Sequence, residues 1–446
     1  MKKILTILLI ASSSFSLSGQ EKKTMTGWKF GGALPAVTYD SNLGFQYGAL
    51  AEFFNYGDPS IFPDFLDHTY TEISRFTKGS GIYRMMFESY RLIPGVHLTS
   101  DLSYLPDQAY HFYGFNGYES VFNKSWMEVE SADYRTMMFY RFKRNQFRFK
   151  NDFEGKLTGE RLKWNAGFAF QAFMNGSVDI DKLNKGKDEK LPSVTDEPGL
   201  YERYQALGLI SENEADGGWV NTVKGGLSWD SRDNLANPMK GLWTEIGIEA
   251  APKFLGNDWG FSRFYITHRQ YFTLIQNDLS AVYRVGYQSK LSGEVPFFYQ
   301  SQVITSMLRG ATNEGLGGSK TLRGVLKNRV VGDGFVYGNV ELRWKPVYFK
   351  LFRQDFYIGL NAFYDFGMIT NKIELPSGLQ TTFASLYPGE KFTDYFNTGS
   401  EKLHQCAGIS IMPVMNQNFV IAVDIGKAFN KQDGNIGFSI GLNYLF

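Results

Sequence analysis

The segment IGFSIGLNYLF, residues 436–446, alternates strictly between two kinds of side chain. One side carries large apolar residues and the other mainly Gly, Ser and Asn, and this period of two is typical of a β-strand. The same alternation recurs at 223–229, 279–287 and 358–366. Segments of about ten residues with one apolar and one polar face are the signature of a membrane β-barrel. A soluble sandwich also alternates, but it must pack its apolar face on a second sheet.

The number of such segments predicts the size of the barrel. The alternation marks 17 candidates between Phe30 and Phe446, and bacterial single-chain barrels have an even number of strands, so we predict an all-β, antiparallel transmembrane barrel of 16 strands. The surplus candidate lies in 132–157, where Lys143-Arg144-Asn145 form either a tight turn or a charged point within one long strand. The sequence leaves both interpretations open.

The spacing of the segments also predicts which connections are long. Four of them, at 105–131, 175–218, 291–333 and 368–402, are expected on the extracellular side if both chain ends lie in the periplasm. Short turns such as Asp230–Lys240 then face the periplasm.

Composition excludes several classes of protein. Of the 446 residues 43% are apolar and 16% aromatic, which rules out a disordered chain. Lys and Arg total 46 against 45 Asp and Glu, and this balance argues against nucleic-acid binding. Cys406 is the single cysteine, so no intramolecular disulfide forms.

The N-terminal segment has the features of a secretory signal. Lys2 and Lys3 precede the apolar run Ile4–Ala11, which small residues follow. The run is too short for a spanning helix, which needs about 20 residues. We predict a signal peptide at 1–19 and one barrel domain at 20–446, with no separate soluble domain.

Two short motifs lie on a long connection and on the strand segment beyond it. Thr321-Leu322-Arg323-Gly324 is followed by Gly332-Asp333-Gly334 and by Gly338–Arg343, and Phe363-Tyr364-Asp365-Phe366-Gly367 comes next. Period two places Asp365 on the lumen side, because its neighbours are apolar, and it places Glu341 there by the same rule.

These segments resemble the BamA/TamA-type outer-membrane assembly barrels, also called bacterial surface antigens. That family carries an Arg-Gly core on its sixth extracellular loop, which folds into the lumen, and a Phe-x-Asp-x-Gly strand motif that pairs with it. Similar segments at 39–44, 112–114 and 230–241 extend the resemblance over almost the whole chain. Val325 departs from the aromatic that usually follows Arg-Gly, and the periplasmic POTRA modules of typical members are missing.

The resemblance implies that a loop folded into the lumen is anchored by an arginine. The implied residues are Leu322, Arg323 and Gly324 on the loop, and Phe363, Asp365 and Gly367 on the strand. A guanidinium can bind a carboxylate through two hydrogen bonds, so we predict that Arg323 binds Asp365, with Glu341 as the second acceptor. The residues alone also fit scattered solvated charges in a wet lumen, which contribute about 0–1 kcal/mol each.

The distance between the two carboxylates is an open point of this prediction. Simple hairpin pairing about a turn near Phe349 puts Asp365 several residues higher on the barrel wall than Glu341. Barrel shear has to close this gap for Arg323 to reach both.

The last two alternate aromatics, Tyr444 and Phe446, fall on the lipid-facing register of the final segment. They resemble the C-terminal signal by which outer-membrane barrels are recognised for assembly. A closing strand with aromatic belt residues has the same appearance.

The resemblance implies a barrel in the outer membrane of a Gram-negative bacterium that helps proteins insert into, or cross, that membrane. Its implied mechanism uses a weak seam between the strand at Phe30–Tyr39 and that at Asn435–Phe446, whose unpaired backbone can bind an incoming strand. Gly437 and Gly441 fit an openable edge, and they fit ordinary lumen crowding equally well. The expected partners are outer-membrane lipid, unfolded outer-membrane proteins and accessory proteins.

Two alternatives remain from the sequence. The first is a passive or plugged pore, or a structural barrel, in which the Arg323 loop is a fixed plug. The second is a barrel enzyme, for which no catalytic motif can be assembled. The five histidines show no His-x-x-x-His metal spacing, so we predict no cofactor, no metal site and no enzymatic activity.

Overall fold

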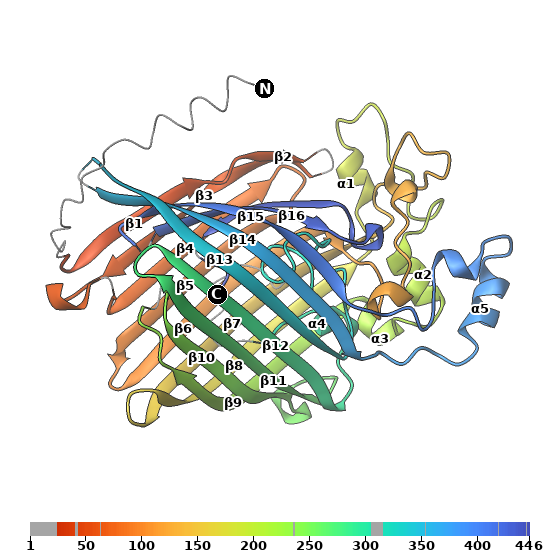
Figure 1. Cartoon of the computed structure of the whole chain (residues 1–446). Coiled ribbons are helices and arrows are strands. Elements are labelled where there is room, and N and C mark those ends of the chain that lie inside the picture. The colour runs from red at the N-terminus through yellow and green to blue at the C-terminus, as the bar shows by residue number, and fades with distance from the viewer. Residues whose placement is uncertain are drawn as a thin grey trace, which may run out of the picture.

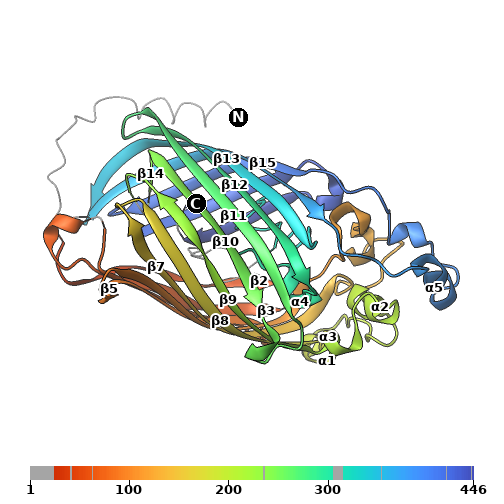
Figure 2. The ribbon, with the colours of Figure 1, turned by 90° about the horizontal axis from the view of Figure 1, so that it is seen from below.

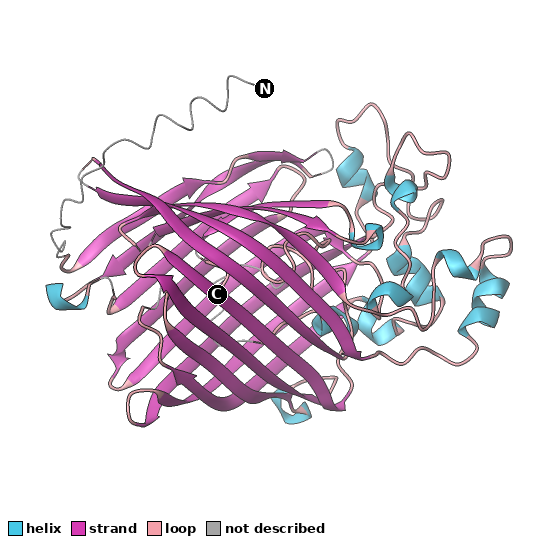
Figure 3. Ribbon diagram, viewed as in Figure 1, coloured by secondary structure: helices cyan, strands magenta, loops and turns pink. Residues whose placement is uncertain are grey.

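A computed structural model describes residues 25–446 except 41–42, 63, 235–236, 305–314, 353, 418 and 443. An antiparallel sheet wraps around into a barrel, with most of the helices gathered at one end (Figures 1 and 3). The predicted signal peptide at 1–19 lies outside the described residues. The strands are β1 Trp28–Pro35, β2 Thr38–Asp40, β3 Gly44–Asn55, β4 Asp67–Phe76, β5 Gly81–Ile93, β6 Val96–His111, β7 Arg141–Thr158, β8 Leu162–Gly176, β9 Gly217–Asp230, β10 Gly241–Ala251, β11 Phe261–Ile275, β12 Leu279–Gly293, β13 Gly334–Leu351, β14 Gln354–Asn371, β15 His404–Met415, β16 Phe419–Ala428 and β17 Ile436–Leu442.

The helices are short and lie in the connections. The α-helices are α1 Ile180–Asn184, α2 Leu200–Ala206, α3 Glu212–Ala215, α4 Phe297–Gln300 and α5 Leu379–Leu386. The 3-10 helices are η1 Pro59–Ile61, η2 Gly117–Glu119, η3 Lys124–Met127, η4 Lys253–Leu255, η5 Phe392–Asp394 and η6 Lys431–Asp433. None of the described helices combines the length and the apolar character needed to cross a membrane.

The sheet confirms the predicted 16 strands. β1 and β2 both pair with β3 and therefore count as one strand, interrupted at 36–37. The open question at 132–157 is also settled, because β7 runs unbroken from Arg141 to Thr158 and contains Lys143-Arg144-Asn145. Its pairing with β8 continues through these residues, since Lys143, Arg144 and Asn145 face Gly176, Asn175 and Met174.

Alternation separates an apolar outer face from a polar lumen. On β17 the outward residues Ile436, Phe438 and Ile440 are more than 60% exposed, as expected of side chains that contact lipid. The lumen side carries buried ion pairs between neighbouring strands, for example between Arg84 and Asp101, which are 2.6 Å apart. Further pairs of this kind are Arg148–Asp101, Arg263–Glu249 and Arg269–Glu245, and the pair Lys224–Asp152 spans β8 to join β9 with β7.

The long connections pack together at one end of the barrel, which we call the loop end (Figure 2). Segments 112–140, 177–216 and 372–403 form a loop dome there, and its core is the largest buried apolar cluster among the described residues. Most of that core is aromatic, including Tyr113, Phe139 and Tyr204. Aromatic pairs of this kind add to the free energy gained by burying apolar surface, so the dome is a packed structure.

The end of the chain departs from the predicted register. β17 ends at Leu442, and Tyr444 and Phe446 contact lumenal side chains instead of facing lipid. The Arg343 guanidinium lies over both rings, with centroid distances of 4.7 and 4.8 Å, and donates a hydrogen bond to Phe446 O. The lipid-facing prediction is therefore wrong, because lumenal arginines offer these aromatics partners that periodicity does not reveal.

Candidate functional site

The described parts of the sixth loop, residues 294–304 and 315–333, fold back into the lumen. We call its described inner part, residues 315–333, the loop tip. An isolated bridge between Leu316 and Val330 closes it, and its apolar side chains pack against the barrel wall. The buried residues of this contact are Val303, Leu316, Leu322, Val325, Val330, Phe335, Tyr337, Ile369 and Cys406.

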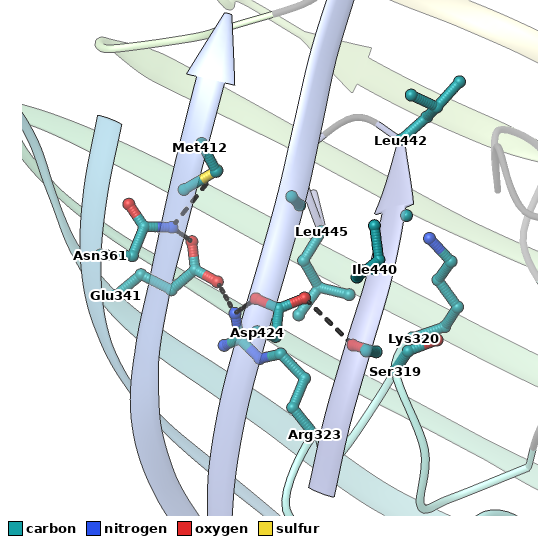
Figure 4. Close-up of a pocket in the computed structure, with 13 residues that line it drawn as sticks. Ser319, Lys320, Arg323, Glu341, Asn361, Met412, Asp424, Ile440, Leu442 and Leu445 are labelled. Atoms are coloured by element: carbon teal, nitrogen blue, oxygen red, sulfur yellow. Dashed lines mark hydrogen bonds and ion pairs between the residues drawn. The ribbon is translucent and has the colours of Figure 1, made fainter. Parts of the chain in front are cut away.

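Arg323 lies at the centre of the contact between the loop tip and the wall. Its Nε and Nη2 donate to the two carboxylate oxygens of Asp365 at 2.9 and 2.8 Å, and its main-chain N–H donates to the same carboxylate at 3.0 Å. Its Nη1 lies 2.6 Å from Glu341 Oε1 and 3.8 Å from Asp424 Oδ1. The guanidinium also covers the ring of Phe363, 3.6 Å from its centroid. One arginine thus meets three carboxylates, and Figure 4 shows two of them, those of Glu341 and Asp424.

The hairpin register explains how Arg323 reaches both predicted carboxylates. The turn lies at Leu351–Gln354, later than the expected position near Phe349. Asp365 therefore faces Asn339, and Glu341 faces Phe363, so that the two carboxylates are diagonal neighbours on adjacent strands. Diagonal neighbours are within reach of one long side chain.

The remaining motif residues make room for this contact. Gly367 packs against Leu322 and Leu316, since a Cβ added there would lie 3.3 Å from a methyl group of each. The Gly324 main-chain N–H donates to Cys406 Sγ at 3.1 Å. The structure therefore brings together all the predicted residues of the loop motif and the strand motif.

Two polar residues that the sequence analysis missed support the site. Asn339 Nδ2 donates to Asp365 Oδ1 at 2.7 Å and to Thr321 O at 2.6 Å. Arg284 donates to Asn339 Oδ1 at 2.8 Å and to Lys320 O at 2.9 Å. A lumen-facing position was the sequence signal for Arg284, and Asn339 also lies in the quoted segment Gly338–Arg343, where no role was predicted for it.

The family model of the Omp85 superfamily domain matches residues 111–444, three quarters of the chain. The chain belongs to the Omp85 superfamily. This result confirms the resemblance found in the sequence, and the two motifs that carried it, Leu322-Arg323-Gly324 and Phe363–Gly367, lie within the matched residues.

Solved structures similar to this Omp85 barrel share little sequence with it. BamA from Haemophilus ducreyi lacking POTRA domains 1–3 is 14% identical, with 94% of this chain and 70% of that chain covered and a TM-score of 0.48. CdiB from Escherichia coli is 10% identical, with 94% and 62% covered and a TM-score of 0.52. The chain thus spans less than two thirds of CdiB, and the likeness concerns the fold. A search of curated proteins finds no match.

Gly324 of the Omp85 barrel has no room for a side chain. An added Cβ would lie 2.7 Å from Cys406 Cβ and 2.9 Å from the main chain of Lys427. We expect Gly324→Ala to lower the free energy of unfolding by about 1–3 kcal/mol, because neither neighbour can move freely. Urea titration measures the loss. Gly225→Ala is the matched control, since a Cβ there meets no atom within 4 Å. Equal stability of the two variants would contradict the close approach.

Arg329 is a second buried arginine on the loop tip, and no sequence motif marks it. Its guanidinium donates to Gln432 O, Gly117 O and Ser120 O, each at 2.8 Å, and the residue has no exposed surface. These acceptors belong to two other loops. Arg329 therefore holds the loop tip to the dome and to the connection before β17.

Glu390 joins three segments of the loop dome. Its carboxylate accepts hydrogen bonds from Arg135 at 2.8 Å and from Arg203 at 3.0 Å. Burial raises the pKa of Glu390, but the hydrogen bonds from Arg135 and Tyr395 and the charge of Arg203 outweigh it, so the pKa lies below its ordinary value. This carboxylate thus stabilises the fold above the ordinary pKa, and its contribution is lost as the pH falls through the lowered pKa.

Acidification to about pH 4 or below is therefore expected to weaken the dome. Thermal melting at pH 7 and at pH 4 measures the effect in the wild type and in Glu390→Gln. We expect a smaller fall in Tm for Glu390→Gln, which has lost this titrating group. Glu128→Gln is the control, because Glu128 forms an exposed ion pair with Lys124. The same fall in all three proteins would contradict a role for Glu390.

Proposed function

We propose that this Omp85 barrel assists the insertion of proteins into, or their translocation across, the outer membrane of a Gram-negative bacterium. Membership of the superfamily supports this proposal, and so does the edge formed by β17. The proposed partners are outer-membrane lipid, unfolded outer-membrane proteins and accessory proteins that deliver them.

The observation that carries the proposal is the seam between the first and last strands. β17 has seven residues and pairs with β16, and no ladder joins it to β1 or β2 among the described residues. Unpaired backbone groups at such an edge can hydrogen-bond an incoming strand, which avoids carrying bare amides through lipid. Gly437 keeps this edge close to the loop tip, because a Cβ there would lie 2.1 Å from Arg323 O.

Arg323, Asp365 and Glu341 are proposed to anchor the loop tip during this process. A loop in the lumen loses chain entropy, which bonds of the kind made by Arg323 offset. The loop tip contacts both β16 and β17, since a Cβ on Gly426 or Gly437 would collide with the main chain of Arg323 and Gly324. The anchor can therefore influence the geometry of the seam.

The test is the folding rate of an unfolded outer-membrane protein into liposomes, with and without the barrel. We expect acceleration by the wild type and its loss in Arg323→Ala. Arg84→Ala is the matched control, because it also removes a buried lumenal arginine bonded to an aspartate, but on β5, away from the loop tip. No acceleration by the wild type, or equal loss in both variants, contradicts the proposal.

A plugged pore is the second candidate, favoured by the loop tip in the lumen and by the dome at the loop end. Conductance in planar bilayers separates the two functions. A plugged pore predicts that Arg323→Ala conducts more than the wild type without any change in the folding rate of other proteins.

A further inference from the structure

A histidine with two carboxylate partners lies where connections of the loop end meet. His404 is the first residue of β15, and its side chain has no exposed surface. Its Nδ1 lies 2.6 Å from Asp433 Oδ1, and its Nε2 lies 3.3 Å from Glu401 Oε2. Asp433 belongs to the connection 429–435 before β17, and Glu401 belongs to the connection 372–403 before β15. One imidazole thus joins two loops that are separate in the sequence.

Tyr118 adds a third loop, the connection between β6 and β7. Its ring stacks on the His404 imidazole with a centroid distance of 3.9 Å. Its hydroxyl donates to Asp433 Oδ2, and its main-chain N–H donates to Glu401 Oε2 at 2.8 Å. The packing is close, because a Cβ added to Gly117 would lie 2.8 Å from His404 Nε2. We call His404, Asp433, Glu401 and Tyr118 the loop latch.

The two partners of His404 determine its charge. A neutral imidazole donates a hydrogen bond from one nitrogen only, whereas an imidazolium donates from both. Each ring nitrogen of His404 faces a carboxylate oxygen, so this geometry requires the imidazolium. No other cation of the described residues lies within ion-pair distance of Asp433 or Glu401. Both buried carboxylates therefore depend on the charge of His404.

The other titratable and charged groups around the loop latch lie farther from the imidazole. The Arg329 guanidinium and the Lys402 ammonium are 5.9 and 5.7 Å from the centroid of the Tyr118 ring. The residue opposite His404 on β14 is Gly367, which carries no charge. Burial and the charge of Asp433 raise the pKa of Tyr118, so its hydroxyl keeps its proton at moderately alkaline pH. His404 is therefore the group of the loop latch that titrates between neutral and alkaline pH.

We propose that the loop latch is a pH-sensitive switch, in which protonated His404 holds the connection before β17 to the dome and loss of the proton releases it. Two carboxylates stabilise the imidazolium, so His404 keeps its proton to a higher pH than a solvated imidazole, which titrates at about pH 6.5. The loop latch thus stabilises the closed loops fully below that pH, and its contribution is lost as the pH rises through the titration of His404.

Asp433 is the partner expected to move when the charge is lost. Glu401 is held by two main-chain donors, since it also accepts the Ile369 N–H at 3.1 Å, whereas the Asp433 carboxylate has side-chain partners. A buried carboxylate without a cation is unstable unless it reaches water. The main chain of Asp433 accepts the Leu326 N–H at 2.8 Å, so its release also loosens the loop tip from the outer end of the seam. The proposal does not require that the barrel inserts proteins.

The test is hydrogen–deuterium exchange of residues 429–435, measured by mass spectrometry on the detergent-solubilised barrel and corrected for the intrinsic effect of pH. We expect exchange in the wild type to be about tenfold faster, or more, at pH 9.5 than at pH 7. His404→Gln is expected to exchange at the fast rate at both pH values, because glutamine carries no titrating charge. His111→Gln is the matched control and is expected to keep the wild-type response, since His111 bonds to the Tyr113 hydroxyl.

Glu401→Gln separates the charge of His404 from its packing. With one carboxylate removed, the pH at which exchange accelerates is expected to fall by about one unit or more, which a purely structural histidine would not produce. If His404→Gln does not fold, as judged by heat-modifiable migration on gels, this shift still decides. Exchange that is equal at both pH values in the wild type overturns the proposal. A pH response that persists in His404→Gln, or that Glu401→Gln leaves at the same pH, overturns it as well. No client protein is present, so the outcome is separate from that of the insertion test.

Discussion

Arg323→Ala is expected to lower the free energy of unfolding by about 3–5 kcal/mol and to release the loop tip from the lumen wall. The substitution removes the cation that the buried Asp365 and Glu341 share, and Glu341 then depends on its ion pair with Arg343. Breaking a buried pair costs more than the pair contributes, because the remaining charge stays out of water. Asn339 and Arg343 remain as donors to these two carboxylates and prevent a larger loss.

Cys406 reports directly on the position of the loop tip. It is the single cysteine, it has no exposed surface, and its sulfur accepts the Gly324 N–H. We expect maleimide to label folded wild type very slowly and Arg323→Ala at least tenfold faster, while urea titration gives the loss of stability. That tenfold difference corresponds to about 1.4 kcal/mol in the opening equilibrium.

Two further variants distinguish the anchor from general damage to the lumen. Arg323→Lys keeps the charge but loses the planar fork, and it is expected to fall between the wild type and Arg323→Ala. Arg84→Ala is expected to lose stability without faster labelling of Cys406, because its partner Asp101 lies far from the loop tip. Unchanged labelling in Arg323→Ala would show that the apolar contacts alone hold the loop.

Arg329→Met is expected to destabilise the barrel by about 3 kcal/mol or more, and to loosen the junction of the loops. Three main-chain carbonyls, those of Gly117, Ser120 and Gln432, lose the guanidinium as donor, and Gly117 O keeps the Ser120 N–H. Arg329 itself has no exposed surface. Each buried acceptor left without a donor costs about 1–3 kcal/mol, and removing the buried charge offsets part of this cost. Methionine preserves most of the volume, so the lost hydrogen bonds dominate.

Limited proteolysis measures the loosening of the loops. Faster cleavage within 112–140 and 429–435 is expected in Arg329→Met, with the strands still protected. Lys431→Met is the control, because it removes a positive charge from an exposed side chain of the same region. Equal cleavage of Arg329→Met and the wild type contradicts the assigned role of Arg329.

Much of the fold and part of the site follow from local pattern. The period of two in the segments at 279–287, 358–366 and 436–442 arises because successive side chains of a strand point in opposite directions. It therefore predicts the strands and their lipid and lumen faces. The number of such segments predicts the 16-stranded barrel. The inward positions of Asp365 and Glu341 follow from the same rule. Arg323 was found through a motif, because its partners lie on other strands.

The tertiary structure decided what depends on register and on the paths of loops. The turn at Leu351–Gln354 places Asp365 and Glu341 within reach of one arginine, and a shift of a few residues in that turn would separate them. Arg329 and Asn339 act through main-chain groups and side chains that no spacing in the sequence marks. Period two also continues through Tyr444 and Phe446, yet these residues enter the lumen. Alternation describes a chain only while a neighbouring strand holds it in the sheet, and beyond Leu442 the lumenal arginines provide the stronger contacts.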